Sequence, residues 1–339
     1  MRPIFPLLTV LTAILLTSQL IIPALSSGPI LRLTVHTTKQ STNVGEDIEI
    51  YGALYYEWQP SYPVSDIVTL QVNYPSTHGL CMLRTLPTAS LEFKTWDVEI
   101  LSLTPCDGSG DPRSTFLKGT LGYFSILWKN NDAISHYVII ALTLVYGNGV
   151  PFMSYAPTSG ALAPGEDRSG LFSVPISTDA LDGPAKAYAS ALVGWPSAGG
   201  YAYSPEKSAS FAISSSLGMA GSSVSLGVGL LSELEPNYNS TLSTLRQGTY
   251  VGNYTVYASS RILGTQQATN TTQFEVMVLG DINGDLLVDG QDFQLVKKAV
   301  PSTPGSPKWR PECDLNGDGI VDGQDFAKLK KFVGNYGVR

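Results

Sequence analysis

The chain has 339 residues, which is enough for roughly two to four domains of ordinary size. Charged residues make up only 14% of it, and Tyr, Ser, Thr and Gly are frequent instead, as they often are in extracellular β-proteins. The formal net charge of −7 and the lack of a basic patch exclude a nucleic-acid partner.

The N-terminal segment is expected to direct the protein to export. Arg2 precedes an apolar run over residues 3–25, and Ala24-Leu25-Ser26 supplies the small residues that a signal peptidase cleaves after. These features predict a signal peptide over residues 1–27. The run is also long enough to span a bilayer, so the alternative is an uncleaved membrane anchor. Contact with a membrane is expected only in that case.

Residues 29–93 alternate between apolar and polar side chains in short runs separated by turn residues. Such period-two runs occur at 31–35, 47–51 and 67–72. They predict β-strands of an all-β sandwich. Val44 to Ile48, with Gly52 beyond, resembles the opening strands of bacterial and archaeal Ig-like surface domains, and this resemblance implies an Ig-like domain over 29–93.

Residues 94–213 contain a second series of strands. The strand expected at 119–131 places Phe124, Ile126 and Trp128 on one face, and 137–146 is apolar on both faces, as in a central strand. Further strands are expected at 96–100, 171–175, 185–193 and 208–213. A strand ending in Lys129-Asn130-Asn131, then a Pro-Gly turn and a closing strand, resembles the cell-adhesion-related CARDB-like Ig fold. The resemblance implies a second sandwich over 94–213.

Residues 214–278 begin with a Gly/Ser-rich link and contain an apolar run at 224–231. The segment Gly252 to Ser259 repeats the pattern of Gly183 to Ser190, and each is followed by a polar stretch and a closing strand. This stretch is short for a complete sandwich. It is therefore either a reduced β-domain or a segment that completes a neighbouring one.

An exported chain with three cysteines leaves at least one of them unpaired. Cys81 and Cys106 are close enough in sequence to be considered as a disulfide. Cys313 has no local partner and is expected to be a small buried residue.

A catalytic site is not expected. The histidines (His36, His78 and His136) show no paired spacing, and the chain has no GxSxG motif, phosphate-binding loop or Cys–His signature. A glycosidase needs two carboxylates that the fold brings together, which sequence alone does not reveal. An enzyme therefore stays the less favoured alternative.

The last sixty or so residues contain one acidic pattern twice, with the second copy 33 positions after the first. Side-chain oxygens stand at relative positions 1, 3, 5, 9 and 12, and a peptide carbonyl is available at 7. The candidate calcium ligands of the first copy are Asp281, Asn283, Asp285, Leu287 (carbonyl), Asp289 and Asp292, and those of the second are Asp314, Asn316, Asp318, Ile320 (carbonyl), Asp322 and Asp325.

Calcium takes six to eight oxygen ligands in flexible geometry, so the pattern predicts two Ca²⁺ ions. Gly319 occupies the sharp-turn position of the second loop, whereas Leu286 occupies it in the first. A left-handed backbone at Leu286 would cost about 1 kcal/mol, so the first loop is expected to bind calcium more weakly. Val288 and Val321 are expected to join the two loops through a short β-contact.

Each loop is followed, but not preceded, by an amphipathic helix. Phe293, Val296 and Val300 lie on one face of the first, and Phe326, Leu329 and Val333 match them in the second. A paired loop and exiting helix at the C-terminus of an exported chain resembles a type I dockerin domain, over residues 280–337. Asp at position 12 also fits that family. The whole chain is thus expected to be mainly β, with tandem Ig-like sandwiches followed by a small helical dockerin module over 279–339.

In dockerins the exiting helices bind a cohesin domain of another protein, and loop positions 10 and 11 help to select it. The resemblance assigns positions 10 and 11 to Gly290 and Gln291 in the first copy and to Gly323 and Gln324 in the second. It assigns the basic pair further along each helix to Lys297 and Lys298, and to Lys330 and Lys331. Because both copies agree, either helix is expected to meet the same partner surface. Many dockerins carry Ser or Thr at positions 10 and 11, so Gly-Gln suggests a different cohesin. The lysines also suit the C-terminal end of a helix dipole without any partner.

Two functions follow from the sequence. The first is an exported, non-catalytic binding or structural protein that docks to a cohesin-bearing scaffold or cell surface. The alternative is a dockerin-borne carbohydrate-active protein, in which a β-sandwich binds or cleaves a polysaccharide.

Overall fold

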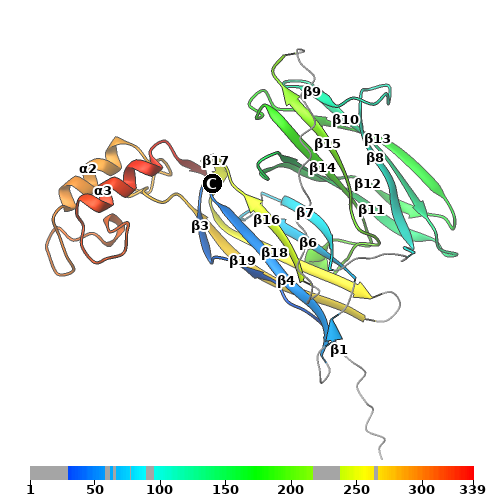
Figure 1. The fold of residues 1–339 in the computed structure, drawn as a ribbon, viewed down its shortest axis with the longest axis horizontal. Coiled ribbons are helices and arrows are strands. Elements are labelled where there is room, and N and C mark those ends of the chain that lie inside the picture. Colours follow the sequence, from blue (N-terminus) through cyan, green and yellow to red (C-terminus); the bar gives the residue numbers. More distant parts are fainter. Residues whose placement is uncertain are drawn as a thin grey trace, which may run out of the picture.

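The computed structural model describes residues 30–57, 62–63, 66–76, 78–88, 95–216, 237–262 and 266–339. The fold is mainly β, as the sequence predicts, with two sandwiches and a small helical module at the C-terminal end (Figure 1). The expected signal peptide over 1–27 and the expected strand at 224–231 lie outside the described residues. Within the described ranges, no helix is long and apolar enough to cross a membrane.

The second sandwich is continuous in sequence, over residues 98–214. One sheet has the order β13-β10-β8 and the other β12-β11-β14-β15-β9. Apolar side chains from both sheets, including Phe124, Ile126 and Trp128, form its buried core. The strands are β8 (Val98–Cys106), β9 (Thr115–Leu117), β10 (Leu121–Asn130), β11 (His136–Tyr146), β12 (Pro151–Leu162), β13 (Asp167–Pro175), β14 (Gly183–Leu192) and β15 (Lys207–Ser214).

The first sandwich is discontinuous. Residues 214–278 supply strands that complete a neighbouring domain, which is one of the two alternatives expected for them, so residues 29–93 do not form a separate domain. Strands from both stretches share its sheets, β1-β4-β16 and β3-β19-β18-β6-β7, and one core. Neither stretch alone supplies two complete sheets. The strands of each stretch therefore have an apolar face that is buried only when the strands of the other stretch pack against it. The strands are β1 (Ile30–Leu33), β2 (His36–Thr37), β3 (Ser41–Asn43), β4 (Asp47–Glu57), β5 (Tyr62–Pro63), β6 (Ile67–Asn73), β7 (Leu80–Pro87), β16 (Asn237–Ser243), β18 (Gly252–Ile262) and β19 (Gln266–Met277).

The two sandwiches have matching topologies. In each, a long strand (β18 or β14) pairs antiparallel with the closing strand (β19 or β15), which pairs parallel with a short early strand (β3 or β9). The repeated segments start at equivalent glycines with positive φ, Gly183 at 124° and Gly252 at 120°. The second sandwich is inserted in the first between β7 and β16. These two strands hold the same positions in the first sandwich as β12 and β13 hold in the second, where a short turn joins them.

The sandwiches pack against each other through β7 of the first, which contacts β11, β12 and β14 of the second, and through β6, which contacts the short 3₁₀ turn at Pro196–Ala198 (Figure 1). Buried apolar residues fill the contact, among them Leu83 and Ala141. The Thr143 hydroxyl accepts a hydrogen bond from Leu83 N (3.1 Å), and the guanidinium of Arg84 contacts the carboxylate of Glu206 at 2.6 Å. This contact explains why β11 is buried on both faces.

The disulfide considered between Cys81 and Cys106 is not formed, and both thiols are free and buried. Cys81 lies on β7 of the first sandwich, whereas Cys106 ends β8 of the second, so proximity in sequence does not bring them into one domain. Burial raises the pKa of Cys81 to about 12, which keeps its thiol protonated and unreactive. Cys313 is buried in the C-terminal core, as expected.

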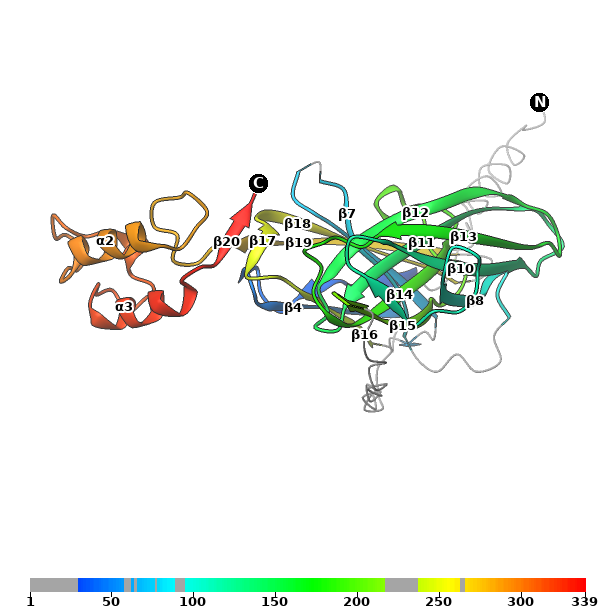
Figure 2. The same cartoon turned by 90° about the horizontal axis from the view of Figure 1, so that it is seen from above.

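The C-terminal module contains helices α2 (Gly290–Ala299) and α3 (Gly323–Leu329) and lies at one end of the molecule, beside the first sandwich (Figures 1 and 2). Its core is small. The buried residues are Val288, Val296, Ala299, Cys313, Leu315, Val321 and Leu329. The short 3₁₀ turn η2 (Pro311–Cys313) precedes the second loop, and the turn η3 (Lys330–Phe332) follows α3. A third such turn, η1 (Pro196–Ala198), lies in the second sandwich.

Candidate metal centre and docking surface

The first residue of each acidic loop organises the backbone of that loop. Asp281 Oδ1 accepts a hydrogen bond from Gly284 N at 2.7 Å, and its Oδ2 accepts one from Leu286 N at 2.8 Å. Asp314 accepts from Gly317 N (2.8 Å) and Gly319 N (2.9 Å) in the same way. These bonds curl the backbone of each loop around the carboxylate of its first residue.

The third and fifth loop positions are tied to each other. Asn283 Nδ2 donates to Asp285 Oδ2 at 2.8 Å, and Asn316 Nδ2 donates to Asp318 Oδ2 at the same distance. Both pairs are exposed at the tips of their loops. The candidate carbonyls at position 7 belong to Leu287 and Ile320, whose side chains point outward and are more than one third exposed.

Positions 9 and 12 of each loop also cap the following helix. Asp289 and Asp322 are the N-caps of α2 and α3, and each accepts from the N–H two residues on, at 2.7 Å. The carboxylates of Asp292 and Asp325 accept hydrogen bonds from the backbone N–H groups of these N-cap residues at 2.8 Å, which completes a capping box. This second role was not predicted from the sequence, although the Asp-x-x-Asp spacing before an apolar run indicates it.

The carboxylates at position 12 are fully buried. Asp292 Oδ1 accepts from Ile282 N (2.8 Å) and Asn283 N (3.3 Å), and Asp325 Oδ1 accepts from Leu315 N at 2.8 Å. A buried carboxylate that is held only by N–H groups favours a cation beside it. Each loop offers carboxylate, amide and carbonyl oxygens alone, which is the donor set that calcium prefers over softer metals. The residues present therefore fit calcium.

The sharp turn of the first loop is left-handed at a non-glycine residue. Leu286 has φ 70° and the equivalent Gly319 has φ 82°. A side chain costs about 1 kcal/mol in this conformation, so Leu286→Gly is expected to strengthen calcium binding at the first loop by about fivefold. Gly319→Ala is the matched change in the opposite direction and should weaken the second loop. Calcium titrations of both variants check this, and equal affinities for Leu286→Gly and the unchanged chain would contradict it.

The two loops do not join each other through Val288 and Val321, which corrects the prediction from the sequence. Val321 exchanges backbone hydrogen bonds with Ser302, and Val288 with residues 334–335. Ser302 and Asn335 are themselves 33 positions apart. The second loop thus pairs with the segment after α2, and the first loop pairs with the segment after α3. The loops have no entering helices that would hold them side by side. The Phe293 and Phe326 rings meet edge to face at 5.6 Å.

All eight candidate partner positions are exposed on this module. Gly290, Gln291, Gly323 and Gln324 lie at the N-termini of α2 and α3, and the lysine pairs lie 7 positions after each glycine. The copies differ at the far end. Lys297-Lys298 belong to α2, whereas Lys330-Lys331 lie in η3 because α3 ends at Leu329.

The apolar face expected in the second helix is also altered at its end. Val333 is 53% exposed, and Phe332 packs against the core in its place. The tighter 3₁₀ turn rotates the chain by more per residue than an α-helix does, so the residue one position earlier faces inward. Phe326 and Leu329 contact the core as predicted.

The end of the chain fastens the module to the first sandwich. Strand β20 (Tyr336–Val338) pairs parallel with β17 (Gln247–Tyr250) of the sandwich, and Gly337 N donates to the carbonyl of Leu286 at 3.0 Å. On the other side of the module, Leu279 N donates to Asn43 Oδ1 at 2.7 Å. β20 therefore links the first acidic loop directly to the sandwich and fixes the orientation of the helices.

Deleting residues 336–339 should release the module without unfolding it. The deletion removes the β17–β20 pairing and the bond from Gly337 N to the carbonyl of Leu286, but every candidate calcium ligand and both helices stay in the chain. Small-angle scattering is expected to show a larger radius of gyration and a broader distribution of distances, while calcium stoichiometry stays unchanged. Gly337→Val should act in the same direction, because a side chain there meets Val251 and Val278. Scattering profiles that superimpose on that of the full chain would disprove the role of β20.

Comparison with known proteins agrees with this geometry at the C-terminal module. Residues 279–334 match the family model of the dockerin type I domain. No curated protein matches the chain.

Solved structures similar to parts of the chain include three of low identity. One is Pseudomonas fluorescens alkylpurine DNA glycosylase AlkC bound to DNA (12% identity, 36% of this chain, 31% of that chain, TM-score 0.28). Another is the C-terminal domain of wzt (12% identity, 42% of this chain, 93% of that chain, TM-score 0.32). The third is a CARDB domain from Pyrococcus furiosus in complex with di-metal ions (11% identity, 38% of this chain, 96% of that chain, TM-score 0.25). The chain spans about a third of the length of the glycosylase.

Type I dockerin domains bind calcium and dock to cohesin domains. The duplicated loops, their exiting helices and the family match agree over the same residues. The C-terminal module of this chain is therefore a type I dockerin domain.

Proposed function

We propose that this is an exported, non-catalytic binding or structural protein that a calcium-folded dockerin attaches to a cohesin domain of another protein, outside the cell or at its surface. The observation that carries the proposal is the duplicated docking surface. Gly290, Gln291, Lys297 and Lys298 are exposed and have identical, exposed counterparts in the second copy. Two calcium ions, one in each loop, rigidify this surface.

The duplicated surface favours two modes of docking that differ by about half a turn. If both are used, reversing the charge of one lysine pair (Lys297→Glu with Lys298→Glu, or Lys330→Glu with Lys331→Glu) should weaken cohesin binding by only about twofold, since one mode remains. Reversing both pairs should abolish binding. Titration calorimetry against a panel of cohesin domains measures this. A large loss from one pair alone would rule out two equivalent modes.

The sandwiches serve in this proposal as the body that the dockerin anchors, with a role in adhesion or presentation. The apolar run after Arg2 supports export, and the rigid contact between the sandwiches supports a fixed spacer. Mass spectrometry of the secreted protein tests the export step. A mature N-terminus near residue 28 is expected, and retention of residues 1–27 would favour the membrane anchor instead.

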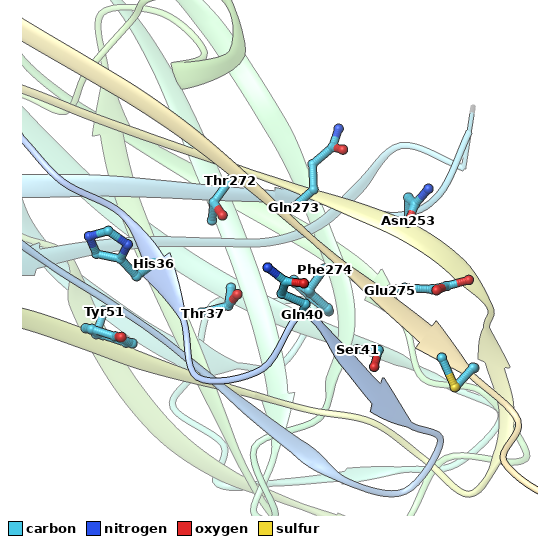
Figure 3. Close-up of a pocket in the computed structure, with 11 residues that line it drawn as sticks. His36, Thr37, Gln40, Ser41, Tyr51, Asn253, Thr272, Gln273, Phe274 and Glu275 are labelled. Atoms are coloured by element: carbon cyan, nitrogen blue, oxygen red, sulfur yellow. The ribbon is translucent and has the colours of Figure 1, made fainter. Parts of the chain in front are cut away.

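A polysaccharide-binding role is the second candidate, and a groove on the first sandwich favours it. The groove has a volume of about 580 Å³ and lies beside β2, β3 and β19. Figure 3 shows His36 and Tyr51 at one end and Asn253 and Glu275 at the other. An exposed aromatic ring beside polar side chains suits stacking against a sugar. Glu275 is the one carboxylate among the described lining residues, so the groove supports binding rather than two-carboxylate hydrolysis.

Co-sedimentation with insoluble polysaccharides separates the two candidates. Retention of the full chain that is lost in Tyr51→Ala would support the sugar-binding role. Release of soluble sugar would contradict a non-catalytic protein. No retention on any polysaccharide would leave dockerin-mediated attachment as the function.

A further inference from the structure

The strand ends at one end of the second sandwich bring together three metal-ligating side chains that do not belong to the dockerin. Asp97 directly precedes β8, Asp132 lies in the turn after β10, and His136 is the first residue of β11. Among the described residues, their ligand atoms all lie within 4.8 Å of one another. Asn131 N donates to the carbonyl of Asp97 at 2.7 Å, which ties the two segments together.

The turn that carries two of these ligands is rigid. The buried side chain of Asn130 donates to the carbonyls of Ile134, Leu162 and Ala163 at 2.7–3.1 Å, and its Oδ1 accepts from Asp132 N at 2.9 Å. These bonds fix the backbone on both sides of Asp132, and Oδ1 of its carboxylate accepts from Ala133 N at 2.6 Å. The carboxylate is therefore held in place without any contribution from a metal.

The imidazole of His136 is oriented from two sides. Its Nε2 lies 2.9 Å from Asp132 Oδ2, and its Nδ1 lies 3.4 Å from the hydroxyl of Tyr203, whose ring meets it edge to face at 5.2 Å. The His136 side chain is only 13% exposed. The Tyr203 hydroxyl donates its own proton to the carbonyl of Tyr137 at 2.9 Å, so it can accept from Nδ1–H. In that tautomer Nε2 carries the lone pair and can act as a ligand once it gives up its contact with Asp132.

The three ligands open onto a cavity of about 390 Å³ where the sandwiches meet. Ile67 and Arg261 of the first sandwich also line it, as do Tyr201 and Tyr203 of the second. The guanidinium of Arg261 lies over the Tyr201 ring, 5.1 Å from its centroid. The cavity therefore leaves room for water or an oxygen ligand next to the three side chains.

We propose that Asp97, Asp132 and His136 form a binding site for a divalent transition-metal ion such as Zn²⁺. Two carboxylates with one neutral imidazole carry a charge of about −2, which such an ion neutralises, and the mixed nitrogen and oxygen donors suit zinc better than calcium. With three protein ligands the ion keeps open positions toward the cavity. On binding, Asp132 and His136 exchange their mutual hydrogen bond for the ion.

Calorimetric titration of the full chain with Zn²⁺ tests the proposal, with calcium present to saturate the dockerin loops. One zinc ion per chain is expected. Asp97→Asn and His136→Gln should each weaken binding by at least about tenfold. His36→Gln, on the first sandwich, is the matched control and should bind as the unchanged chain does.

Cobalt substitution gives a readout that does not depend on the variants folding. Co²⁺ bound by the three residues should show weak visible bands without the strong near-ultraviolet absorption of a cobalt–thiolate bond. No zinc uptake, a thiolate band, or folded variants that bind zinc as tightly as the unchanged chain would overturn the proposal. If a variant does not fold, the cobalt spectrum of the unchanged chain decides.

Discussion

Removing calcium is expected to unfold α2 and α3 while both sandwiches stay folded. The dockerin buries few apolar side chains, and modules of this size seldom fold on their hydrophobic core alone. Each loop concentrates four aspartates, and those at position 12 are fully buried, so without a cation their repulsion and desolvation oppose the fold. At free calcium about 100 times the dissociation constant, each saturated loop contributes about 2.7 kcal/mol.

Far-ultraviolet circular dichroism with EGTA measures this effect. The helical signal should disappear, the strand signal should persist, and calcium should restore the helices. Asp325→Ala should produce the same loss in the second half even with calcium, because three backbone N–H groups lose their acceptor. Asp111→Ala, which removes an exposed acid from the second sandwich, is the matched control. A helical signal that survives EGTA would show that the module folds without metal.

Glu206→Ala is expected to destabilise the contact between the sandwiches by about 3–5 kcal/mol. The side chains of Arg84 and Glu206 are only 18% and 11% exposed, and Glu206 also accepts from Thr85 N at 2.8 Å. Burial lowers the pKa of the Arg84 guanidinium, and the charge of Glu206 raises it above its ordinary value. When Glu206 is removed only the effect of burial remains, but an arginine guanidinium is not deprotonated in proteins, so its charge is left buried and unpaired. The cost comes mainly from that unpaired charge.

Scanning calorimetry should record this as a fall in the first denaturation midpoint of roughly 10 °C. The double variant Arg84→Met with Glu206→Met replaces both charges by apolar groups and should recover most of the loss. The Arg84 guanidinium also lies 3.7 Å from the centre of the Tyr188 ring, a contact that methionine can replace. If Glu206→Ala and the double variant are equally destabilised, the charge pair is not the cause.

The positions of strands can be predicted from the sequence wherever one face of the strand is buried and the other is exposed. β10 alternates strictly, so Phe124, Ile126 and Trp128 were assigned to the core correctly. β12 was missed because it is an edge strand whose side chains are mostly half-exposed. Its composition therefore shows no clear period.

The discontinuous first sandwich was not predictable in the same way. Period-two patterns reveal that a segment is a strand but not which strand it pairs with, and the partners here are separated by an entire inserted domain. The repeat of Gly183 to Ser190 at Gly252 to Ser259 was the usable signal. Because these segments form β14 and β18 at equivalent places, the repeat indicated that the last stretch ends a sandwich like the one before it.

The dockerin was the most predictable part, because calcium chemistry prescribes residue types at fixed positions. What sequence could not supply were contacts between segments, such as Val288 with Asn335 or β20 with β17. The cluster of Asp97, Asp132 and His136 was likewise missed. Only the spacing of Asp132 and His136 hinted at it, and the fold supplies Asp97 from another strand.

Calorimetric titration of the full chain with a panel of cohesin domains, once with calcium and once with EGTA, tests the docking function most directly. At least one member of the panel is expected to bind with one cohesin per chain when calcium is present, and the same member should not bind in EGTA. Binding that persists without calcium, or no binding to any cohesin while the dockerin is folded and calcium-loaded, would contradict it.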